Sequence, residues 1–559
     1  MVTEKHDVLI VGGGLAGMRA ALELQGKCDV AVLCKTYPNL AHSTQAQGGI
    51  NAAIHPKDNW KDHFYDTVFG GDYLTDQDAA EVLCSDAPRA IHEMEKWGTP
   101  FTRTEDGKIA QRAFGGQRFK RTCFAADRTG HALVHTLYNH VIEKGVKIYD
   151  EHIALALLAE NRQIAGVLAM DISDTSFRIF QTKAVILATG GAGRVYGKTT
   201  NPENTGDGIA IAYRAGLPIM DMEMIQFHPT TLIRSNKLLS EAARGEGAYL
   251  INVKGERFMK RYAPDKMELA PRDIVSRAIT KEIMEGRGVN GDSVHLDFRH
   301  MDPDYVMKRL PDMHKNALEL SGIDLLKDPV PVQSGQHYTM AGIACNTDAE
   351  TGLSGLFVAG ECANVSVHGA NRLGGNSLME TLVFGRRAGK NALKYIKRKT
   401  FSRPSDTKEK LHEKKFRQWM APKKDEFSAR VLRIEMGAIM DTFVGPYRDG
   451  NMLKGAVQKI SGLRSRFDEN IRVMESAKAF NAELRDAVEL DFMLDLAYAI
   501  AYSALHRTES RGAHYRTDYP ERDDKNWLKH ILLYRTAVEP RIAYRPVKIT
   551  RLQPKERKY

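Results

Sequence analysis

The sequence has no hydrophobic run long enough to cross a membrane. Its longest apolar stretch, LDLAYAIAYSAL from Leu494, is broken by Asp495 and falls short of the roughly 20 residues that a membrane-spanning helix needs. The apolar run near the N-terminus, Val8 to Val11, is interrupted by three glycines and predicts no secretory signal. We therefore expect a water-soluble protein that contacts a membrane only through a partner.

Cysteine is scarce as well. The six cysteines are scattered without a CxxC pair, which argues against a zinc ribbon, an iron–sulfur cluster and a disulfide framework. No metal site is predicted, and reduced thiols in the cytosol are expected.

The composition also has no extremes. Hydrophobic residues make up 43% and charged residues 27% of the chain, so disordered and fibrous classes are excluded. At 559 residues the chain exceeds the roughly 250–300 residues of one core and predicts two to four domains. The net charge of +10 allows docking on an acidic partner, an anionic membrane or nucleic acid. No basic stretch carries interleaved aromatic residues, which disfavours nucleic acid.

A glycine-rich turn follows the first predicted strand. Residues 7–11, DVLIV, run into Gly12-Gly13-Gly14-Leu15-Ala16-Gly17 and then into the helical pattern MRAALELQ. In such a turn the first glycine makes the bend, the second lets the backbone approach a pyrophosphate, and the third lets helix pack on strand. The pattern predicts dinucleotide binding around Gly12, Gly14 and Gly17, with a ligand-free glycine turn as the alternative.

Three later stretches also resemble buried strands, and two of them run into glycine. The second strand, VAVLCK from Val30, ends in Cys34 and Lys35 where an acid usually holds the adenosine ribose. Further apolar strands run into glycine at residues 184–193 and 355–361. Three such turns spread over 360 residues suggest one Rossmann-like domain interrupted by an insertion, and favour FAD over NAD.

A set of longer motifs carries a family resemblance. These are AHSTQAQGGI, DTVFGGDYLTDQDA, AADRTGHALVHTLY, QFHPT, SEAARGEGAYLIN, HGANRLGGNSL and RTESRGAHYRTDYPERDD. With them the chain strongly resembles the flavoprotein subunits of succinate dehydrogenase and fumarate reductase. The resemblance implies an α/β fold: a Rossmann-like FAD-binding domain at 1–223 and 334–400, interrupted by an α+β capping domain at 224–333. A helical bundle domain at 401–516 and a C-terminal segment at 517–559 would follow.

By this resemblance His42 matches the histidine that is bonded to the C8α methyl of FAD, an 8α-histidyl link. Such a bond raises the reduction potential of the flavin, which suits a substrate as reluctant as succinate. The family usually has Arg-Ser before this histidine, whereas Leu40 and Ala41 stand here. A lone loop histidine is otherwise more often a cap or a surface residue.

Further cofactor contacts follow from the same resemblance. They are Gly12, Gly14, Gly17, Lys35, Ser43, Gly48, Gly49, Asp207, Glu361, Ser377 and Leu378. Glu361 could instead cap the helix that begins after it.

A four-carbon dicarboxylate needs fixed donors at both ends, and arginine and histidine suit that task. The resemblance assigns substrate binding to His228, Ser240, Glu241, His337, Arg372 and the backbone of Gly49. Ser240 stands where threonine is commoner. Taken singly, each arginine could form a surface ion pair and each histidine a structural hydrogen bond.

The resemblance assigns proton transfer to Arg272, with Glu241 and Arg244 as its relay. Because the arginine pKa exceeds 12, Arg272 must promptly recover any proton it gives away. Glu241 and Arg244 are three residues apart and are expected to share one helical face. Much of this set lies on the predicted capping domain, so closure over substrate is expected to exclude water.

The implied function is oxidation of succinate to fumarate by hydride transfer to FAD. Because the chain has no cluster ligands, electrons are expected to pass to a separate iron–sulfur subunit, and that subunit to a membrane anchor and the quinone pool. The protein is expected at the cytoplasmic face of the cell membrane, held through its partners. Fumarate reduction is the alternative direction, although Gln47 in AQGG favours the dehydrogenase over the AEGG of many reductases.

Two other functions are compatible with part of the sequence. L-aspartate oxidase shares most of the dicarboxylate-site residues but holds FAD without a covalent bond, so His42 argues against it. A flavin-containing RNA-modifying protein would have no use for the arginine and histidine set.

Helical periodicity dominates the last third of the chain. The charged run at 398–416, with Pro404, predicts a linker. Apolar residues then recur at helical spacing from Leu453 to Phe467 and from Leu490 to Leu505, which predicts the core faces of a small bundle. The tail from Thr517 is expected to fold back on the main body.

Overall fold

The apolar run Val8–Val11 lies at the centre of a seven-stranded sheet in the computed structural model, which describes residues 2–405, 407–423 and 425–557. The strand order is β6-β2-β1-β9-β8-β7, and β16 pairs with the second half of β9. The five parallel strands are β1 (Val2–Val11), β2 (Val30–Leu33), β6 (Lys147–Tyr149), β9 (Phe177–Leu187) and β16 (Leu356–Val358). The antiparallel edge is formed by β7 (His152–Glu160) and β8 (Gln163–Asp171).

Helices cover the sheet because its middle strands are apolar throughout. Around α1 (Leu15–Leu24) lie α4 (Thr129–Glu143) and α11 (Asn376–Ile396), followed outward by α2 (Trp60–Gly70) and α3 (Gln77–Lys96). Helices α1 and α11 approach closely at Gly385, where a Cβ would lie 2.5 Å from the carbonyl oxygen of Ala16. Helix α5 (Asp207–Arg214) packs against β7.

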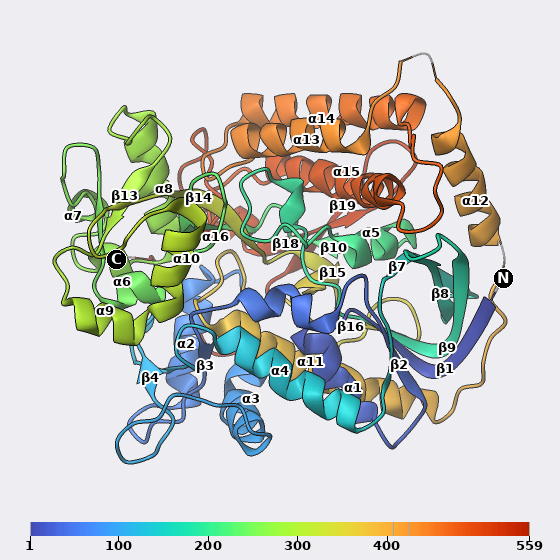
Figure 1. Ribbon diagram of the computed structural model, residues 1–559, viewed down its shortest axis with the longest axis horizontal. Coiled ribbons are helices and arrows are strands. Elements are labelled where there is room, and N and C mark those ends of the chain that lie inside the picture. Colours follow the sequence, from blue (N-terminus) through green and yellow to red (C-terminus); the bar gives the residue numbers. More distant parts are fainter. Residues whose placement is uncertain (1, 406, 424, 558–559) are drawn as a thin grey trace.

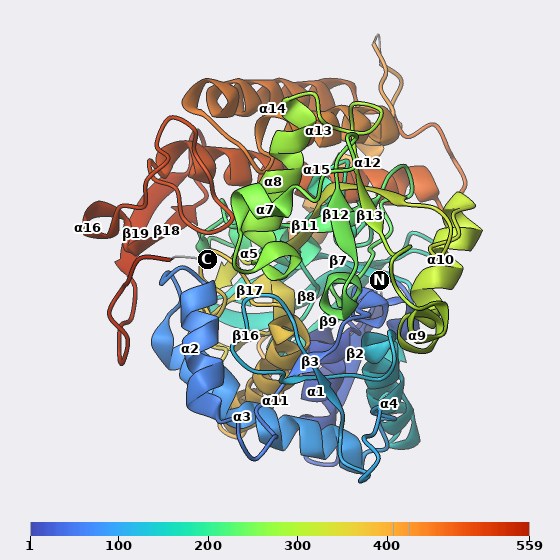
Figure 2. The same cartoon turned by 90° about the vertical axis from the view of Figure 1, so that its left-hand side faces the viewer.

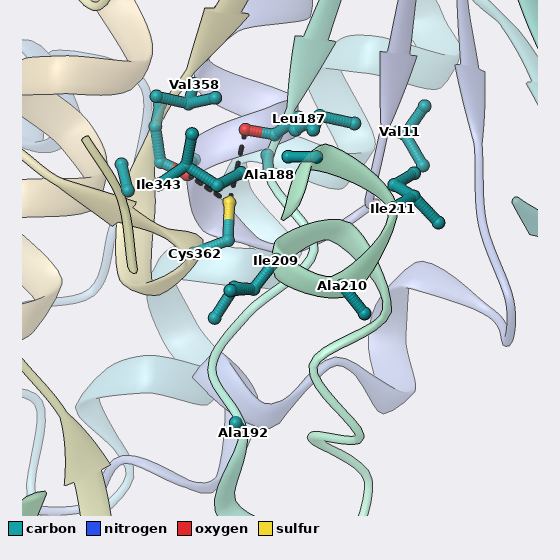
Figure 3. Packing of buried hydrophobic residues seen from close by; sticks show 14 of the residues in the cluster. Val11, Leu187, Ala188, Ala192, Ile209, Ala210, Ile211, Ile343, Val358 and Cys362 are labelled. Atoms are coloured by element: carbon teal, nitrogen blue, oxygen red, sulfur yellow. Dashed lines mark hydrogen bonds between the residues drawn. The ribbon is translucent and has the colours of Figure 1, made fainter. Parts of the chain in front are cut away.

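Figure 3 shows the apolar packing near the carboxyl ends of the parallel strands. Side chains of Val11, Leu187 and Val358 gather there near Ile209 and Ile211 of α5, all of them buried. The thiol of Cys362 donates to the carbonyl oxygen of Leu187 at 3.4 Å. This packing holds the strand ends where the glycine turns begin.

A second sheet, ordered β11-β14-β13-β12, has an apolar core of its own that includes Leu250, Phe258, Val294 and Phe298. Its strands are β11 (Ile225–Leu232), β12 (Tyr249–Ile251), β13 (Val294–Asp297) and β14 (Val330–Thr339). The accompanying helices are α6 (Ala242–Glu246), α7 (Met259–Tyr262), α8 (Arg272–Met284), α9 (Pro303–Arg309) and α10 (Pro311–Ser321). In Figure 2 this part faces the viewer, with α13 and α14 above it and α2 and α3 below.

Three long helices, α13 (Ala429–Phe443), α14 (Gly450–Asn470) and α15 (Ala482–His506), lie together along the top of Figure 1. The linker prediction for 398–416 was wrong over its second half, because α12 (Thr407–Met420) begins within it. Lysine and glutamate favour helix, and Pro404 excludes helix only at its own position and just before it. Phe416 and Trp419 are buried and anchor α12.

The C-terminal tail returns to the body through a five-stranded sheet, β17-β15-β10-β18-β19. Its strands are β10 (Ile219–Met220), β15 (Gly342–Ala344), β17 (Ala363–Asn364), β18 (Lys529–Tyr534) and β19 (Arg541–Pro546), with α16 (Asp524–Trp527) ahead of β18. A three-stranded sheet is formed by β3 (Ile50–Asn51), β4 (Gln111–Arg112) and β5 (Thr122–Cys123). Among the described residues, no helix combines the length and apolarity needed to cross a membrane. The predicted domain boundaries stay a prediction.

Candidate active site

One long cavity, with about 1580 Å³ of space between atoms that is partly open to solvent, runs from the glycine turn after β1 to a group of arginines and histidines beside β11 and β14. Seventeen of the nineteen site residues predicted from the sequence line it. They are Gly12, Gly14, Lys35, His42, Ser43, Gly48, Gly49, Asp207, His228, Ser240, Glu241, Arg272, His337, Glu361, Arg372, Ser377 and Leu378. Gly17 and Arg244 lie outside the lining.

The glycine turn forms one end of the cavity. Gly12 has φ +115°, and a Cβ there would overlap the carbonyl oxygen of Ala188. Gly14 is the N-cap of α1, so the unpaired N–H groups at the start of this helix can bind an anion. Gly17 lies in α1, where a Cβ would overlap the carbonyl oxygen of Gly12, so this glycine allows close packing of the helix on the turn; its contact with a cofactor stays a prediction.

Lys35, two residues after β2, forms ion pairs with two acidic residues at the cavity. Lys35 Nζ lies 3.0 Å from Asp207 and 2.9 Å from Glu489, and donates to Thr205 Oγ1 at 2.6 Å. Burial opposes its charge, but the two carboxylates raise the pKa of Lys35 above its usual value. Glu489 belongs to α15, so the helical part of the chain fixes a side chain that lines the cavity.

His42 lies in the 3₁₀ helix η2 (His42–Gln45) at the middle of the cavity. Burial, together with the charges of Lys237 and Arg372, lowers the pKa of His42 to about 4. The imidazole is therefore neutral at pH 7, and its Nδ1 is buried without a hydrogen-bond partner in the described chain. A neutral imidazole is the form that can act as a nucleophile.

Two glycines follow in the same loop. Gly49 has φ +135°, and a Cβ there would lie 2.5 Å from Thr122 Cγ2 and 2.6 Å from the carbonyl oxygen of Cys123. Gly48 packs against the ring of Phe114 and near Ser240 Oγ. The loop therefore lies against the arginine and histidine end of the cavity with no room for side chains.

Arg272 and Glu241 form a buried ion pair on that wall. Arg272 Nε donates to Glu241 Oε2 at 2.8 Å, and Arg272 Nη1 donates to Gln226 Oε1 at 3.0 Å. The other oxygen of Glu241 accepts from the N–H of Gly115 at 2.8 Å. Burial alone would raise the pKa of Glu241, but Arg272 and Arg244 outweigh it and hold that pKa below its usual value.

Arg244 lies behind this pair. Its Nη2 is 3.9 Å from Glu241 Oε1, and its Nη1 donates to the carbonyl oxygen of Glu268 at 2.6 Å. It also lines a separate open cavity together with Arg257, whose side chain is 38% exposed. The side chains of Arg272, Glu241 and Arg244 thus lead from the main cavity toward solvent.

Two histidines stand side by side near the pair. The rings of His228 on β11 and His337 on β14 are 4.9 Å apart and edge to face. The N–H of Thr230 donates to His228 Nδ1, which leaves Nε2 to carry the proton, and Nε2 is buried without a partner among the described residues. Burial and Arg272 lower the pKa of both histidines, so both are neutral donors at pH 7.

Arg372 completes this end of the cavity. Its Nη1 donates to Ser377 Oγ at 3.1 Å, while its buried Nε has no partner in the described parts of the chain. The side-chain amide of Gln226 donates to the carbonyl oxygen of Arg372 at 2.7 Å. Two residues earlier, Ala370 donates to Gly71 O at 2.8 Å and accepts from the N–H of Ala513 at 2.9 Å.

Glu361 lies between the two ends. It accepts from the N–H of Thr339 at 2.9 Å, and burial raises its pKa to about 8 against the opposing effects of that N–H and of Arg372. The capping alternative for Glu361 was wrong, because the next α-helix, α11, begins only at Asn376. Ser377 and Leu378 lie in the first turn of α11, whose N-terminus faces the cavity.

The residues fit a long ligand with a phosphate at one end and a small anion at the other. The lining of the cavity extends from the glycine turn after β1 to His337 and Arg372, so one elongated ligand can contact both ends. Two helix N-termini open into it, and buried polar atoms of His42, His228 and Arg372, residues of its lining, have no partner within the described part of the chain. Such groups are costly unless a ligand satisfies them. At the anion end Arg272 and Arg372 outnumber Glu241, which leaves a net positive charge.

Four residues that contribute to the site were not predicted from the sequence. Gln226 bonds both the side chain of Arg272 and the backbone of Arg372. In the motif QFHPT only His228 was predicted to be functional. The amide of Gln226, two residues before it in an apolar strand, was the signal that could have been used. Glu489 was hidden in an apolar stripe of α15, where a buried acid is itself the signal. Gly115 and Phe114 carried no recognisable pattern.

Comparisons with known proteins agree with this geometry. Residues 7–378 match the FAD binding domain family, and residues 433–559 match the family described as fumarate reductase flavoprotein C-term. The chain is 43% identical to the succinate dehydrogenase flavoprotein subunit of Rickettsia bellii, over 99% of this chain and 97% of the relative. It is 41% identical to the fumarate reductase flavoprotein subunit of Mycobacterium tuberculosis, with 100% of both chains covered.

A solved structure of a mutant form of the E. coli quinol fumarate reductase FrdA is similar with a TM-score of 0.96. The identity is 37%, over 100% of this chain and 99% of that chain. Mycobacterium smegmatis Sdh1 in complex with UQ1 is similar with a TM-score of 0.87 and 36% identity, over 99% of this chain and 96% of that chain. These likenesses confirm the predicted fold class.

Proposed function

The chain belongs to the family of succinate dehydrogenase and fumarate reductase flavoprotein subunits, and we propose that it oxidises succinate to fumarate with FAD bound covalently through His42. As a member of this family it is an FAD-binding oxidoreductase. The observation that carries the proposal is the Arg272–Glu241 pair, which faces the same cavity as His228, His337 and Arg372.

Succinate binds through both of its carboxylates. Arg372 offers its Nε–H and His228 its Nε2–H, neither of which has a partner among the residues that the structure describes. His337 Nδ1 lies 2.9 Å from Thr200 Oγ1, and in the tautomer that accepts from this hydroxyl the Nε2–H of His337 is left for the ligand. Because both histidines are neutral, the positive charge that attracts the dianion comes from the arginines.

Proton transfer is assigned to Arg272. Glu241 Oε2 first takes a proton from Arg272, and the neutral guanidine that remains takes a proton from a methylene carbon of succinate, which restores the guanidinium. Arg244 then carries charge toward the second cavity, so that the relay ends near solvent. The bound FAD supplies the hydride acceptor, and the bond to His42 is expected to raise its reduction potential.

The residues proposed for the cofactor follow the length of the cavity. Gly12 and Gly14 with the N-terminus of α1 would hold the pyrophosphate, and Lys35 with Asp207 the adenosine part. Ser43, Gly48, Gly49, Glu361, Ser377 and Leu378 would surround the rest. The neutral imidazole of His42 supports attachment, because only an unprotonated nitrogen can form the bond.

Residues 224–333 are proposed as a capping domain that closes over the substrate and excludes water. They carry His228, Ser240, Glu241, Arg244 and Arg272, so closure brings together the two sides of the clamp. Dehydrogenation is the proposed direction, since Gln47 lines the cavity where many fumarate reductases have glutamate. One active site catalyses both directions, and the acceptor decides the balance.

The proposed partners are an iron–sulfur subunit and, through it, a membrane anchor at the cytoplasmic face of the membrane, in respiration and the tricarboxylic acid cycle. The support is that the relatives are named flavoprotein subunits.

The test compares the protein with His42→Ala on a denaturing gel viewed under ultraviolet light. Fluorescence is expected in the wild type and in the control His55→Ala, whose histidine is exposed, and is expected to be lost in His42→Ala. Turnover of succinate with an artificial acceptor is measured in parallel. A fluorescent His42→Ala band, or no succinate turnover in the wild type, contradicts the proposal. L-aspartate oxidase activity is checked with L-aspartate and oxygen.

A further inference from the structure

Three buried side chains form a cluster behind Arg372. The hydroxyl of Tyr338 donates to Glu380 Oε2 at 2.5 Å, and His368 Nε2 lies 2.9 Å from the same oxygen. Tyr338 comes from β14, Glu380 from α11, and His368 from the loop before α11. The three are 6%, 3% and 4% exposed, so the cluster is closed to water.

The cluster contacts Arg372 through the tyrosine ring. The guanidinium carbon of Arg372 lies 4.3 Å from the centre of the Tyr338 ring. Tyr338 is part of the cavity lining, whereas Glu380 and His368 stand behind it. A carboxylate thus acts on Arg372 through an aromatic ring, without touching the guanidinium.

Arg372 needs such support. Burial and the nearby charge of Arg272 lower the pKa of Arg372, and Ser377, which accepts from its Nη1, is neutral. Glu361 is a weak counter-charge, because burial raises its pKa to about 8. A tyrosine whose O–H donates to a carboxylate has a more electron-rich ring, and such a ring attracts a cation more strongly.

The arrangement also keeps the guanidinium available. A carboxylate bonded directly to Arg372 would occupy the paired N–H groups that recognise a substrate carboxylate. The Tyr338 ring contacts the flat face of the Arg372 guanidinium, so the N–H groups along the edge of the guanidinium stay free. The unpartnered Nε of Arg372 is in keeping with this.

We propose that Tyr338, Glu380 and His368 are positioning residues for Arg372. They keep its guanidinium charged, hold the guanidinium plane against the Tyr338 ring, and leave the N–H edge free for one carboxylate of the substrate. This inference rests on the proposed role of Arg372 as a substrate clamp. None of the three has to touch the substrate through a polar atom; they act through Arg372.

The test uses Tyr338→Phe, which keeps the ring, and Glu380→Gln, which keeps the shape but removes the charge. In the flavin-loaded protein, KM for succinate is expected to rise about tenfold in each variant, with kcat within about threefold of the wild type. Titration calorimetry with malonate, a dicarboxylate that cannot be dehydrogenated, is expected to give the same rise in Kd. The double variant is expected to match the single variants, because both changes break one network.

The matched control is Tyr149→Phe. Tyr149 is buried and its hydroxyl donates to Glu4 at 3.0 Å, so it is a second tyrosine–glutamate pair, at the far edge of the central sheet. This variant is expected to bind malonate like the wild type and to report only the structural effect of losing such a hydroxyl.

The outcomes distinguish the role of Arg372 as a substrate clamp from the positioning role of Tyr338, Glu380 and His368. If Arg372→Lys leaves malonate binding unchanged, the clamp itself is wrong. If Arg372→Lys weakens binding while Tyr338→Phe and Glu380→Gln bind malonate as the wild type does, the clamp stands and the positioning role is overturned. A fall in kcat with unchanged KM would also overturn it.

Discussion

Arg272 places both Nε and Nη2 2.8 Å from one oxygen of Glu241, Oε2. The remaining oxygen is held by a backbone N–H, so the carboxylate cannot turn away. The pair therefore fixes the orientation of the arginine as well as neutralising it. Glu241 therefore has two roles: it exchanges a proton with Arg272, and it holds the Arg272 side chain in one orientation.

Replacement of Arg272 by lysine is the first prediction. Lysine keeps the charge but cannot bond Glu241 through two nitrogens and reach Gln226 as well. We expect kcat for succinate to fall by about 10²–10⁴, with covalent flavin retained on a denaturing gel. Arg277→Lys, on the same helix but outside the cavity, should stay within about tenfold of the wild type. Equal losses in the two variants would remove Arg272 from the chemistry.

The backbone of Gly49 provides a second prediction. In Gly49→Ala the new Cβ would meet Thr122 and the carbonyl of Cys123 at 2.5–2.6 Å, at a φ of +135° that alanine rarely adopts. Flavin content per protein and the thermal midpoint are both expected to drop. Gly26→Ala is the control, because Gly26 also has positive φ but nothing lies within 4 Å of its Cβ position. It should lower stability by only about 1 kcal/mol and leave flavin bound. Flavin content like that of the wild type in Gly49→Ala would contradict the close approach.

A third prediction concerns pH. His530 is fully buried between Asp221 at 2.8 Å and Asp76 at 3.1 Å. Burial opposes its charge, but the two carboxylates raise the pKa of His530 to about 9. The folded pKa lies above the unfolded value of about 6.5, so the stabilisation is complete below pH 6.5 and is lost as the pH rises through 9. Its size is on the order of 3 kcal/mol.

Thermal unfolding at several values between pH 6 and pH 9.5 tests this. The wild-type midpoint is expected to fall across that window. His530→Gln, which cannot be protonated, should start lower and fall less. Parallel curves for the two proteins would show that another group is responsible.

Some of the site could be found from the sequence because it lies in compact motifs. His42, His228 and Arg372 each stand in a short stretch whose residue types are unusual together, and the structure brings them to one cavity. Gln226 escaped notice because an amide has no charge to mark it, and its importance comes from Arg272 and Arg372, which are distant in sequence. Glu489 escaped because its apolar neighbours indicated core; only the fold brings Lys35 to it.

The fold was predictable to a similar degree. Strand-then-glycine patterns located β1, β9 and β16, since their apolar runs are continuous. Helix α12 was missed because its charged residues suited both linker and helix, and only burial of Phe416 and Trp419 decides between them. Strand β18 pairs with β10, more than 300 residues away, which no local pattern reveals, and β19 joins the sheet through β18.

The hydrogen bonds of Ala370 have a consequence for how the molecule matures. Its carbonyl is held by Ala513, so the loop that carries Arg372 gains its last support from a segment made roughly 140 residues later. A ribosome that stalls before this segment emerges would leave a nascent chain able to build the glycine turn but without a seated clamp. The chain thus becomes able to bind the dicarboxylate only late in its synthesis, after most of the polypeptide has left the exit tunnel.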